Sequence, residues 1–503
     1  MTAATAAGRL PGPRPLGQLR YLKGLLGNPY TALLDLQRRY GPVCKFGFGS
    51  QQYVMLFGAE ANQLLLTDSP DNPKFLSRDV LSLLIPVVGS CAMVVSDGEE
   101  HRRRRSLVQP AFARRRIQGY VPVMLDEIHR MIDSWQPGQR VDAFTDVRSC
   151  IRRIAIRSLF GDRLQAHTDE IGRELETALR YINRSPFLRF DHDLPGTGFR
   201  RAMAARRRVD DRVRAEIDKR RAEPDDRGDV LDALLGSCDH GGDRLADLEV
   251  RDQVISLIAS GYDSSSAAAS WAFYALLSHP EVYDRIRAEV AAVAGDDELT
   301  AEHLAAMDYV GWTVDEILRL YTPGVLTGRT AIESFSFAGQ VIPSGTKVLY
   351  SQYVTHRLPE LWSEPEVFRP ERWDTSAADY REPVPFSFVP FGGGYRRCIG
   401  FSFAELELRA LIVELARRTE LSLVGGAVLP TGVATMWPKG GVPVSVRAIR
   451  PNSAVPNPDG RGAANSASQA GPNAGSDALS NSVAEEGRLR PAVPDADGWG
   501  EQD

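Results

Sequence analysis

The sequence predicts a mostly α-helical protein with small β-sheets, folded as a single large domain. Helical patterns, with apolar stripes and charged faces, dominate from about Gly58 to Leu320. Alternating apolar residues bounded by turn residues occur only in short stretches, such as residues 335–349. After about Arg450 the chain turns to Pro, Asn, Ser, Gly and Ala, which offer little to bury.

Each element follows from the local pattern in chain order. Residues 28–58 predict a helix that ends at Gly41 and is followed by two strands. The stretch "VISLIASGYDSSSAAASWAFYALLSHP" predicts a long helix that ends before Pro280. Further strands are expected in residues 335–349, 421–432 and 440–449.

These patterns predict three segments. Residues 1–15 are rich in Pro and Gly and are expected to be flexible. Residues 16–450 form the folded domain, since 43% of the 503 residues are hydrophobic and can build a large core. Residues 451–503 are expected to be a disordered tail, which need not carry any activity.

Composition excludes several classes of protein. The net charge of −5 gives no general attraction to nucleic acid or to an anionic membrane. No stretch approaches eighteen apolar residues, and the N-terminus lacks the apolar core of a signal peptide. No flavin or nicotinamide motif is visible. We therefore expect a cytoplasmic monomer that does not insert into a membrane.

The number and spacing of the cysteines do not suggest a disulfide framework. There are five, widely spaced and without a Cys-x-x-Cys pair: Cys44, Cys91, Cys150, Cys238 and Cys398. A disulfide scaffold or a structural zinc site is not expected from such a set, and a reducing compartment fits it better.

One of these cysteines lies in an unusual loop, "PFGGGYRRCIG", from Pro390 to Gly400. Its three glycines let a large flat ligand approach the main chain. Cys398 precedes a predicted helix, and the helix N-terminus together with the neighbouring arginines is expected to lower the thiol pKa. The thiolate would then be a nucleophile or a metal ligand. The alternative is a small buried cysteine in a glycine-rich turn.

Three other patterns have ordinary explanations when taken singly. Glu316 and Arg319 are spaced to meet on one helix face, as a surface ion pair would be. The small residues 260–270 suit tight helix packing, but Asp263 is a carboxylate in an otherwise apolar helix and needs a partner or a purpose. The basic run of residues 98–116 could be a solvated face.

Together these motifs resemble the cytochrome P-450 family of haem-thiolate monooxygenases, of the soluble bacterial type. Phe391, Gly394, Arg396, Cys398 and Gly400 match its Phe-x-x-Gly-x-Arg-x-Cys-x-Gly signature. Glu316 and Arg319 match its Glu-x-x-Arg signature, and "FRPERW" supplies Arg372. The resemblance implies the cytochrome P-450 fold, and a Glu316–Arg319–Arg372 network that braces the cysteine loop.

The resemblance also implies a cofactor and the residues that hold it. Cys398 would be the proximal ligand of the iron in haem b, iron protoporphyrin IX. Residues at the family's propionate-binding positions are His101, Arg105, Arg329 and Arg396. Residues 260–264 resemble the family's Ala-Gly-x-Asp/Glu-Thr stretch, with Ser260 in place of Ala and Ser264 in place of Thr.

Within that stretch Gly261 would leave room for dioxygen, Ser264 would hydrogen-bond bound oxygen or a water, and Asp263 would relay protons. Adjacent helix positions differ by about 100°, so Asp263 and Ser264 need a bulge or a water to cooperate. Ser264 keeps the hydroxyl of Thr but lacks its β-branch, which puts coupling efficiency rather than reaction type in question.

The expected function is hydroxylation of a lipophilic small molecule of fatty acid, terpenoid, steroid or polyketide type. Electrons would come from NAD(P)H through a separate ferredoxin and ferredoxin reductase, which Arg102, Arg103 and Arg397 could face. The pocket is expected among residues 80–95, 179–190, 325–326 and 432–438. The alternatives are a haem-thiolate isomerase or peroxygenase, and a haem-binding protein without turnover.

Overall fold

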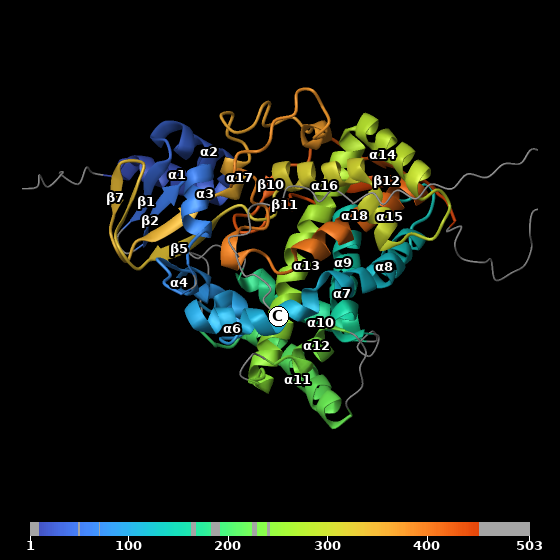
Figure 1. Cartoon of the computed structure of the whole chain (residues 1–503), viewed down its shortest axis with the longest axis horizontal. Coiled ribbons are helices and arrows are strands. Elements are labelled where there is room, and N and C mark those ends of the chain that lie inside the picture. The colour runs from blue at the N-terminus through green and yellow to red at the C-terminus, as the bar shows by residue number, and fades with distance from the viewer. Residues whose placement is uncertain are drawn as a thin grey trace, which may run out of the picture.

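The computed structural model confirms the mostly helical architecture with small sheets (Figure 1). It describes residues 10–48, 51–69, 71–161, 167–182, 192–223, 229–238 and 242–451. The helices, with 3-10 helices written η, are α1 (Pro15–Gly27), α2 (Pro29–Tyr40), α3 (Ala59–Leu66), α4 (Arg78–Leu81), η1 (Ser82–Leu84), α5 (Ile85–Val88), η2 (Met93–Val95), α6 (Gly98–Val108), η3 (Gln109–Phe112), α7 (Arg114–Gly119), α8 (Val121–Asp133), α9 (Ala143–Phe160), α10 (Thr168–Ile182), α11 (Gly198–Ala222), α12 (Val230–Gly236), α13 (Asp247–Ser278), α14 (Pro280–Val293), α15 (Ala301–Ala306), α16 (Asp308–Leu320), α17 (Gln352–Thr355), η6 (Pro370–Trp373), η7 (Gly394–Arg396) and α18 (Phe401–Arg418).

Among the described residues, the strands gather into four small sheets. A five-stranded sheet has the order β1-β2-β8-β5-β3, in which β2 and β8 are parallel and the other pairs antiparallel; a three-stranded sheet has the order β4-β12-β9, and β6-β7 and β10-β11 are two-stranded. The strands are β1 (Val43–Phe48), β2 (Gln51–Leu56), β3 (Phe75–Leu76), β4 (Arg140–Asp142), β5 (Thr327–Ala331), β6 (Phe335–Phe337), β7 (Gln340–Ile342), β8 (Lys347–Tyr350), β9 (Thr419–Leu423), β10 (Pro430–Thr431), β11 (Trp437–Pro438) and β12 (Pro443–Ile449).

Local signals fix the helix ends that the sequence predicts. The Asn28 side chain accepts a hydrogen bond from the Thr31 backbone at 3.2 Å and caps α2, which ends at Gly41 with φ +76°. The long helix α13 stops at Ser278, and Pro280 begins α14 two residues later, because proline cannot continue a helix but fits its first turn. These boundaries confirm the predicted ones.

Helix α13 forms the central axis of the molecule and runs through its middle in Figure 1. The largest core cluster joins it to α8, α9, α16 and α18 through residues such as Ala269, Phe273, Ile128, Ile154 and Leu411. Burial of these side chains fixes α13 against α18, the helix that follows Cys398. The fold therefore holds the two predicted functional segments in one rigid frame.

The predicted limits of the folded domain remain a prediction. The flexible start falls partly, and the disordered tail almost wholly, on residues 1–9 and 452–503, which lie outside the described residues. Within the described part of the chain, no helix is both long enough and apolar enough to cross a membrane.

Candidate functional site

The loop that carries Cys398 is held by main-chain bonds and by glycine. The Cys398 amide donates to the Phe391 carbonyl at 2.9 Å, and the Arg397 amide donates to the Gly394 carbonyl at 2.9 Å. Gly394 has φ +58°, and a Cβ there would lie 1.8 Å from the Leu66 carbonyl oxygen on α3. Only glycine fits this contact, so Gly394 is what allows the loop to pack closely against α3.

The Cys398 side chain is accessible although protein surrounds it. Its surface is exposed, yet desolvation raises the pKa of its thiol above the usual value. The Gly400 amide, Arg105 and Arg397 act in the opposite direction but do not outweigh burial. The predicted lowering of the thiol pKa is therefore wrong for the chain without a bound ligand.

Helix α13 presents an open face in an otherwise buried helix. Ser260, Gly261 and Ser264 are exposed, while Ala267–Ala269 and most other residues of the helix are buried. A Cβ added at Gly261 would meet no atom within 4 Å, so there is free space in front of this face. The Ser264 hydroxyl donates to the Ser260 carbonyl at 2.8 Å and is thus folded back on its own helix.

Asp263 points away from this open face. One carboxyl oxygen, Oδ2, accepts a hydrogen bond from the Thr435 hydroxyl at 2.9 Å. Burial raises the pKa of Asp263 to about 6, opposed by the Thr435 bond and by the charge of Arg148. Helix α13 is continuous here, and Asp263 and Ser264 bond to different groups. Because the helix is continuous, cooperation between Asp263 and Ser264 would need a water rather than a bulge.

The four predicted propionate-binding residues come together from three parts of the chain. His101 and Arg105 lie on α6, Arg329 on β5 and Arg396 on η7. Burial and then the charges of Arg396, Arg105 and Arg329 lower the pKa of His101 to about 3, which shows that these cations share one site. Asp97 is paired with Arg396.

This cluster fits a ligand with two carboxylates. Among the described residues, His101 Nδ1 and Arg396 Nε are buried without a hydrogen-bond partner. Buried polar atoms of this kind are costly unless a ligand or water satisfies them. Three guanidinium groups, one of which pairs with Asp97, suit the two propionates of haem.

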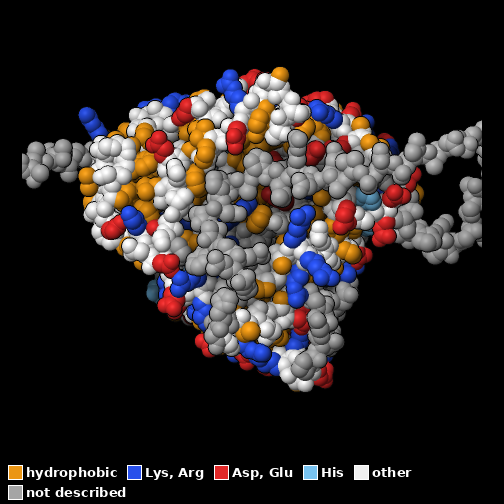
Figure 2. All heavy atoms as spheres, viewed as in Figure 1, with side chains coloured by type: hydrophobic (Ala, Val, Ile, Leu, Met, Phe, Trp, Pro, Cys, Tyr) orange, Lys and Arg blue, Asp and Glu red, His pale blue; other side chains and the backbone are white. Residues whose placement is uncertain are grey.

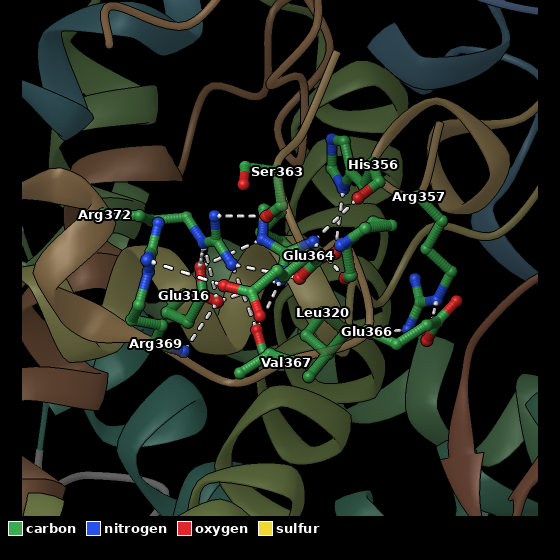
Figure 3. A network of polar contacts seen from close by, with 12 residues as sticks. Glu316, Leu320, His356, Arg357, Ser363, Glu364, Glu366, Val367, Arg369 and Arg372 are labelled. Atoms are coloured by element: carbon green, nitrogen blue, oxygen red, sulfur yellow. Dashed lines mark hydrogen bonds and ion pairs between the residues drawn. The ribbon is translucent and has the colours of Figure 1, made fainter. Parts of the chain in front are cut away.

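The predicted Glu316–Arg319–Arg372 network is present (Figure 3). The Arg319 guanidinium contacts the Glu316 carboxylate at 2.9 Å, and Arg372 Nε reaches it at 3.0 Å. Glu316 and Arg319 are fully buried. The ordinary explanation, a surface ion pair, is therefore wrong. Burial opposes the charge of Glu316, but the arginines keep its pKa below the usual value.

His356 links this network to the cysteine loop. Its Nδ1 donates to the Arg319 carbonyl at 3.1 Å, and its Nε2 accepts from the Val389 amide at 3.0 Å, two residues before Phe391. Burial and the neighbouring Arg319 and Arg357 lower the pKa of His356 to about 3, so the ring is neutral. The bracing role that the resemblance implies thus has a visible route.

Sequence reasoning missed several residues around the site. His356, Thr435 and Asp97 act through contacts between distant segments, and no local spacing marks them. Glu407 could have been noticed, because it is a carboxylate among the buried, mostly apolar residues of the predicted helix after Cys398, as is Glu414. Glu407 contacts Ser265 of α13, and burial raises its pKa to about 8.

Comparison with known proteins agrees with this geometry. The family model described as cytochrome P-450 matches residues 10–435. The chain belongs to the cytochrome P-450 family. Haem is this family's cofactor and its members are monooxygenases, so this chain is a cytochrome P-450 monooxygenase.

Individual relatives cover most of the chain. The putative cytochrome P-450 139 of Mycobacterium tuberculosis is 41% identical, over 84% of this chain and 98% of the relative. The cyclooctat-9-en-7-ol 5-monooxygenase of Streptomyces melanosporofaciens is 31% identical, over 84% and 91%. The solved structure of retinoic acid-bound cyanobacterial CYP120A1 superimposes with a TM-score of 0.80 at 27% identity, over 88% of this chain and all of that one.

Proposed function

We propose that this cytochrome P-450 hydroxylates a lipophilic small molecule with O₂, using electrons from NAD(P)H that a separate ferredoxin and ferredoxin reductase deliver. The observation that carries the proposal is the accessible thiol of Cys398, held in a glycine loop beside a convergent set of cationic residues. Bound haem supplies the redox and oxygen chemistry, and the protein supplies its ligand, its anchors, protons and a pocket.

The residues take separate roles. Cys398 would ligate the iron of haem, and His101, Arg105, Arg329 and Arg396 would hold its propionates. Phe391, Gly394 and Gly400 would shape the loop that carries Cys398. Gly261 would leave free space in front of α13, Ser264 would offer a hydroxyl at this open face, and Asp263 would hold and release a proton near it.

The substrate proposal rests on apolar segments and on two relatives. Residues 81–95 pack on α10 and α13 in a cluster that includes Val87, Val88, Leu179 and Tyr262. Leu81, Leu84, Ile85 and Val94 are only partly buried there and can contact a ligand. Val325 and Met436 prove to be core, and residues 183–190 lie outside the described part.

One relative is named for cyclooctat-9-en-7-ol and one structure contains retinoic acid. Both molecules are largely hydrocarbon with a single oxygen function. We infer a substrate of this kind, within the fatty acid, terpenoid, steroid and polyketide classes.

The partner proposal rests on the family and on the lack of a flavin or nicotinamide motif in the sequence. The suggested contact residues give it little support, because Arg103 is paired with Glu249 at 3.0 Å and Arg102 with Asp71. On the face shown in Figure 2, basic and acidic side chains are interspersed rather than separated by sign. A cytoplasmic location is proposed because the few, widely spaced cysteines suit a reducing compartment.

The experiment is turnover with a surrogate ferredoxin and ferredoxin reductase. Purified protein is screened with lipophilic compounds for spin-state shifts, and compounds that shift it are incubated with NAD(P)H and O₂. We expect NAD(P)H consumption and a product heavier by one oxygen atom. Rearranged product without O₂ uptake would instead identify an isomerase, and turnover only with added peroxide would identify a peroxygenase. Haem binding without any turnover would contradict the proposed function.

A further inference from the structure

Asp263 has a single fixed contact at its carboxyl group. Oδ2 accepts from the Thr435 hydroxyl at 2.9 Å, across 172 positions in sequence. Oδ1 is buried and has no hydrogen-bond partner among the described residues. The direction of this carboxyl is therefore set by the Thr435 hydroxyl, on a helix face about 100° away from Ser264.

The hairpin that carries Thr435 is firmly anchored. Gly432 turns it with φ +96°, where a Cβ would lie 2.1 Å from the Thr435 carbonyl oxygen. On either side of Thr435, the Ala434 carbonyl accepts from the Val325 amide at 3.3 Å and the Met436 amide donates to the Pro323 carbonyl at 3.0 Å.

The hairpin is also tied to the helix that carries the acid. Trp271 Nε1, on α13 two turns beyond Asp263, donates to the Met436 carbonyl at 2.9 Å. These bonds place the Thr435 hydroxyl at a defined point against α13. A side chain held so firmly can orient its partner rather than follow it.

Charged groups from two further helices face Asp263. Arg148 of α9 lies over the rings of Tyr262 and Trp437, at 5.1 and 5.2 Å from their centroids, and pairs with Glu176 of α10 at 3.3 Å. Burial raises the pKa of Asp263, Thr435 and Arg148 lower it, and Glu176 raises it. The balance leaves this carboxyl able to exchange a proton near neutral pH, which general acid catalysis needs.

We propose that Thr435 is a positioning residue for proton transfer, which acts by fixing the carboxyl of Asp263 from the β10–β11 hairpin. The inference rests on the proposed function, in which Asp263 supplies protons to the oxygen side of the haem. Thr435 itself touches no reacting atom. Its effect passes through one hydrogen bond, so it can be removed without changing the haem ligand or the propionate contacts.

The test is infrared titration of the full-length, haem-loaded protein, with Thr435→Val as the variant. Valine keeps the shape and removes the hydroxyl. The difference between wild type and Asp263→Asn isolates the Asp263 carboxyl from Glu407, which is also protonated near neutral pH. Thr435→Ser keeps the hydroxyl and should restore the wild-type titration of Asp263. Thr431→Val is the matched control, because it makes the same change at an exposed position of the same hairpin.

We expect the Asp263 band of wild type to titrate near pH 6. Thr435→Val should move it upward by about one unit, a tenfold change in proton affinity, because a hydrogen bond to the charged form is lost. Thr435→Ser and Thr431→Val should titrate like wild type. With a substrate from the screen, Thr435→Val should send more electrons to hydrogen peroxide and fewer to product.

Two results would overturn the inference: a Thr435→Val titration that coincides with wild type, or no titrating carboxyl in the difference between wild type and Asp263→Asn. The carbon monoxide spectrum of each variant separates the two claims. If the spectrum is that of a normal haem thiolate and the Asp263 titration is not shifted in Thr435→Val, only the positioning role of Thr435 is rejected. An abnormal spectrum in wild type rejects the proposed function, while the titration still decides whether Thr435 sets Asp263.

Discussion

At the scale of single residues, the site contains polar groups whose pKa values burial shifts away from their ordinary values. Asp263, Glu407 and Cys398 have raised pKa values, and His101 and His356 have lowered ones. Burial is the largest cause in each case. Groups with shifted pKa values cluster at functional sites because catalysis needs them. Structural groups such as His356 also have shifted pKa values.

Glu407 offers a direct test of this burial. The unfolded chain releases its proton near pH 4.5, whereas the folded chain keeps it to about pH 8. Folding therefore takes up a proton in this window, and Glu407 makes the protein less stable as pH rises through it. Glu407→Gln should be more stable than wild type at pH 8, on the order of a few kcal/mol, and nearly equal at pH 5. Urea unfolding of both proteins at pH 8 and pH 5 measures this difference in stability. A difference that does not depend on pH would contradict the raised pKa of Glu407.

Single residues show most clearly which parts of the site can be predicted from the sequence. Cys398, Glu316, Arg319 and the propionate residues lie in short motifs whose spacing is local, so they could be named in advance. Thr435 and His356 could not, because their bonds join segments 172 and 33 residues apart. The predicted lowering of the Cys398 thiol pKa is wrong for a related reason. The helix N-terminus and the neighbouring arginines can be recognised in the sequence, but desolvation of the thiol depends on the whole fold.

At the scale of elements, the loop before α18 depends on contacts that only glycine allows. Gly394→Ala would place a Cβ 1.8 Å from the Leu66 carbonyl oxygen, in a left-handed backbone conformation. We expect loss of most bound haem, measured as haem per protein after purification.

Gly426→Ala is the matched control, because a Cβ there meets no atom within 4 Å and the backbone angle is ordinary. It should bind haem like wild type. Equal haem content in Gly394→Ala and Gly426→Ala would show that the loop does not need this close approach.

The second element-scale prediction concerns the network of α16 and η6. Glu316→Ala would leave Arg319 and Arg372 buried around a missing carboxylate, and Trp373 Nε1 would lose its acceptor at 3.1 Å. Removal of one partner from a buried pair costs about 3–5 kcal/mol. Denaturant unfolding should show a loss of this size.

The control for that measurement is Glu420→Ala. Glu420 pairs with Arg450 at 3.2 Å, but both side chains are about half exposed. Such a pair contributes about 1 kcal/mol at most. If the two variants lose the same stability, the network does not brace the fold.

At the scale of the whole molecule, one rigid frame around α13 brings together segments that are distant in sequence. The mostly helical architecture was predictable, because its amphipathic patterns are long and its boundaries carry Gly41 and Pro280. The pairing of β2 with β8 and the placing of the β10–β11 hairpin against α13 were not. Tertiary contacts of this kind leave no periodic trace.

The tail gives a prediction at this scale. Residues 452–503 lie outside the described residues, and their composition predicts that they bury little. A chain shortened to end at Pro451 should keep the haem content of the full chain and its melting temperature within a few degrees. Loss of haem on shortening would show that the tail contributes to the fold.

The central claim is that Cys398 binds haem iron as a thiolate. The most direct measurement is the difference spectrum of the reduced protein with and without carbon monoxide. We predict a strongly red-shifted Soret band, which Cys398→Ser should move to the ordinary position of haem proteins. A band at the ordinary position in wild type, or no haem at all, would contradict the claim.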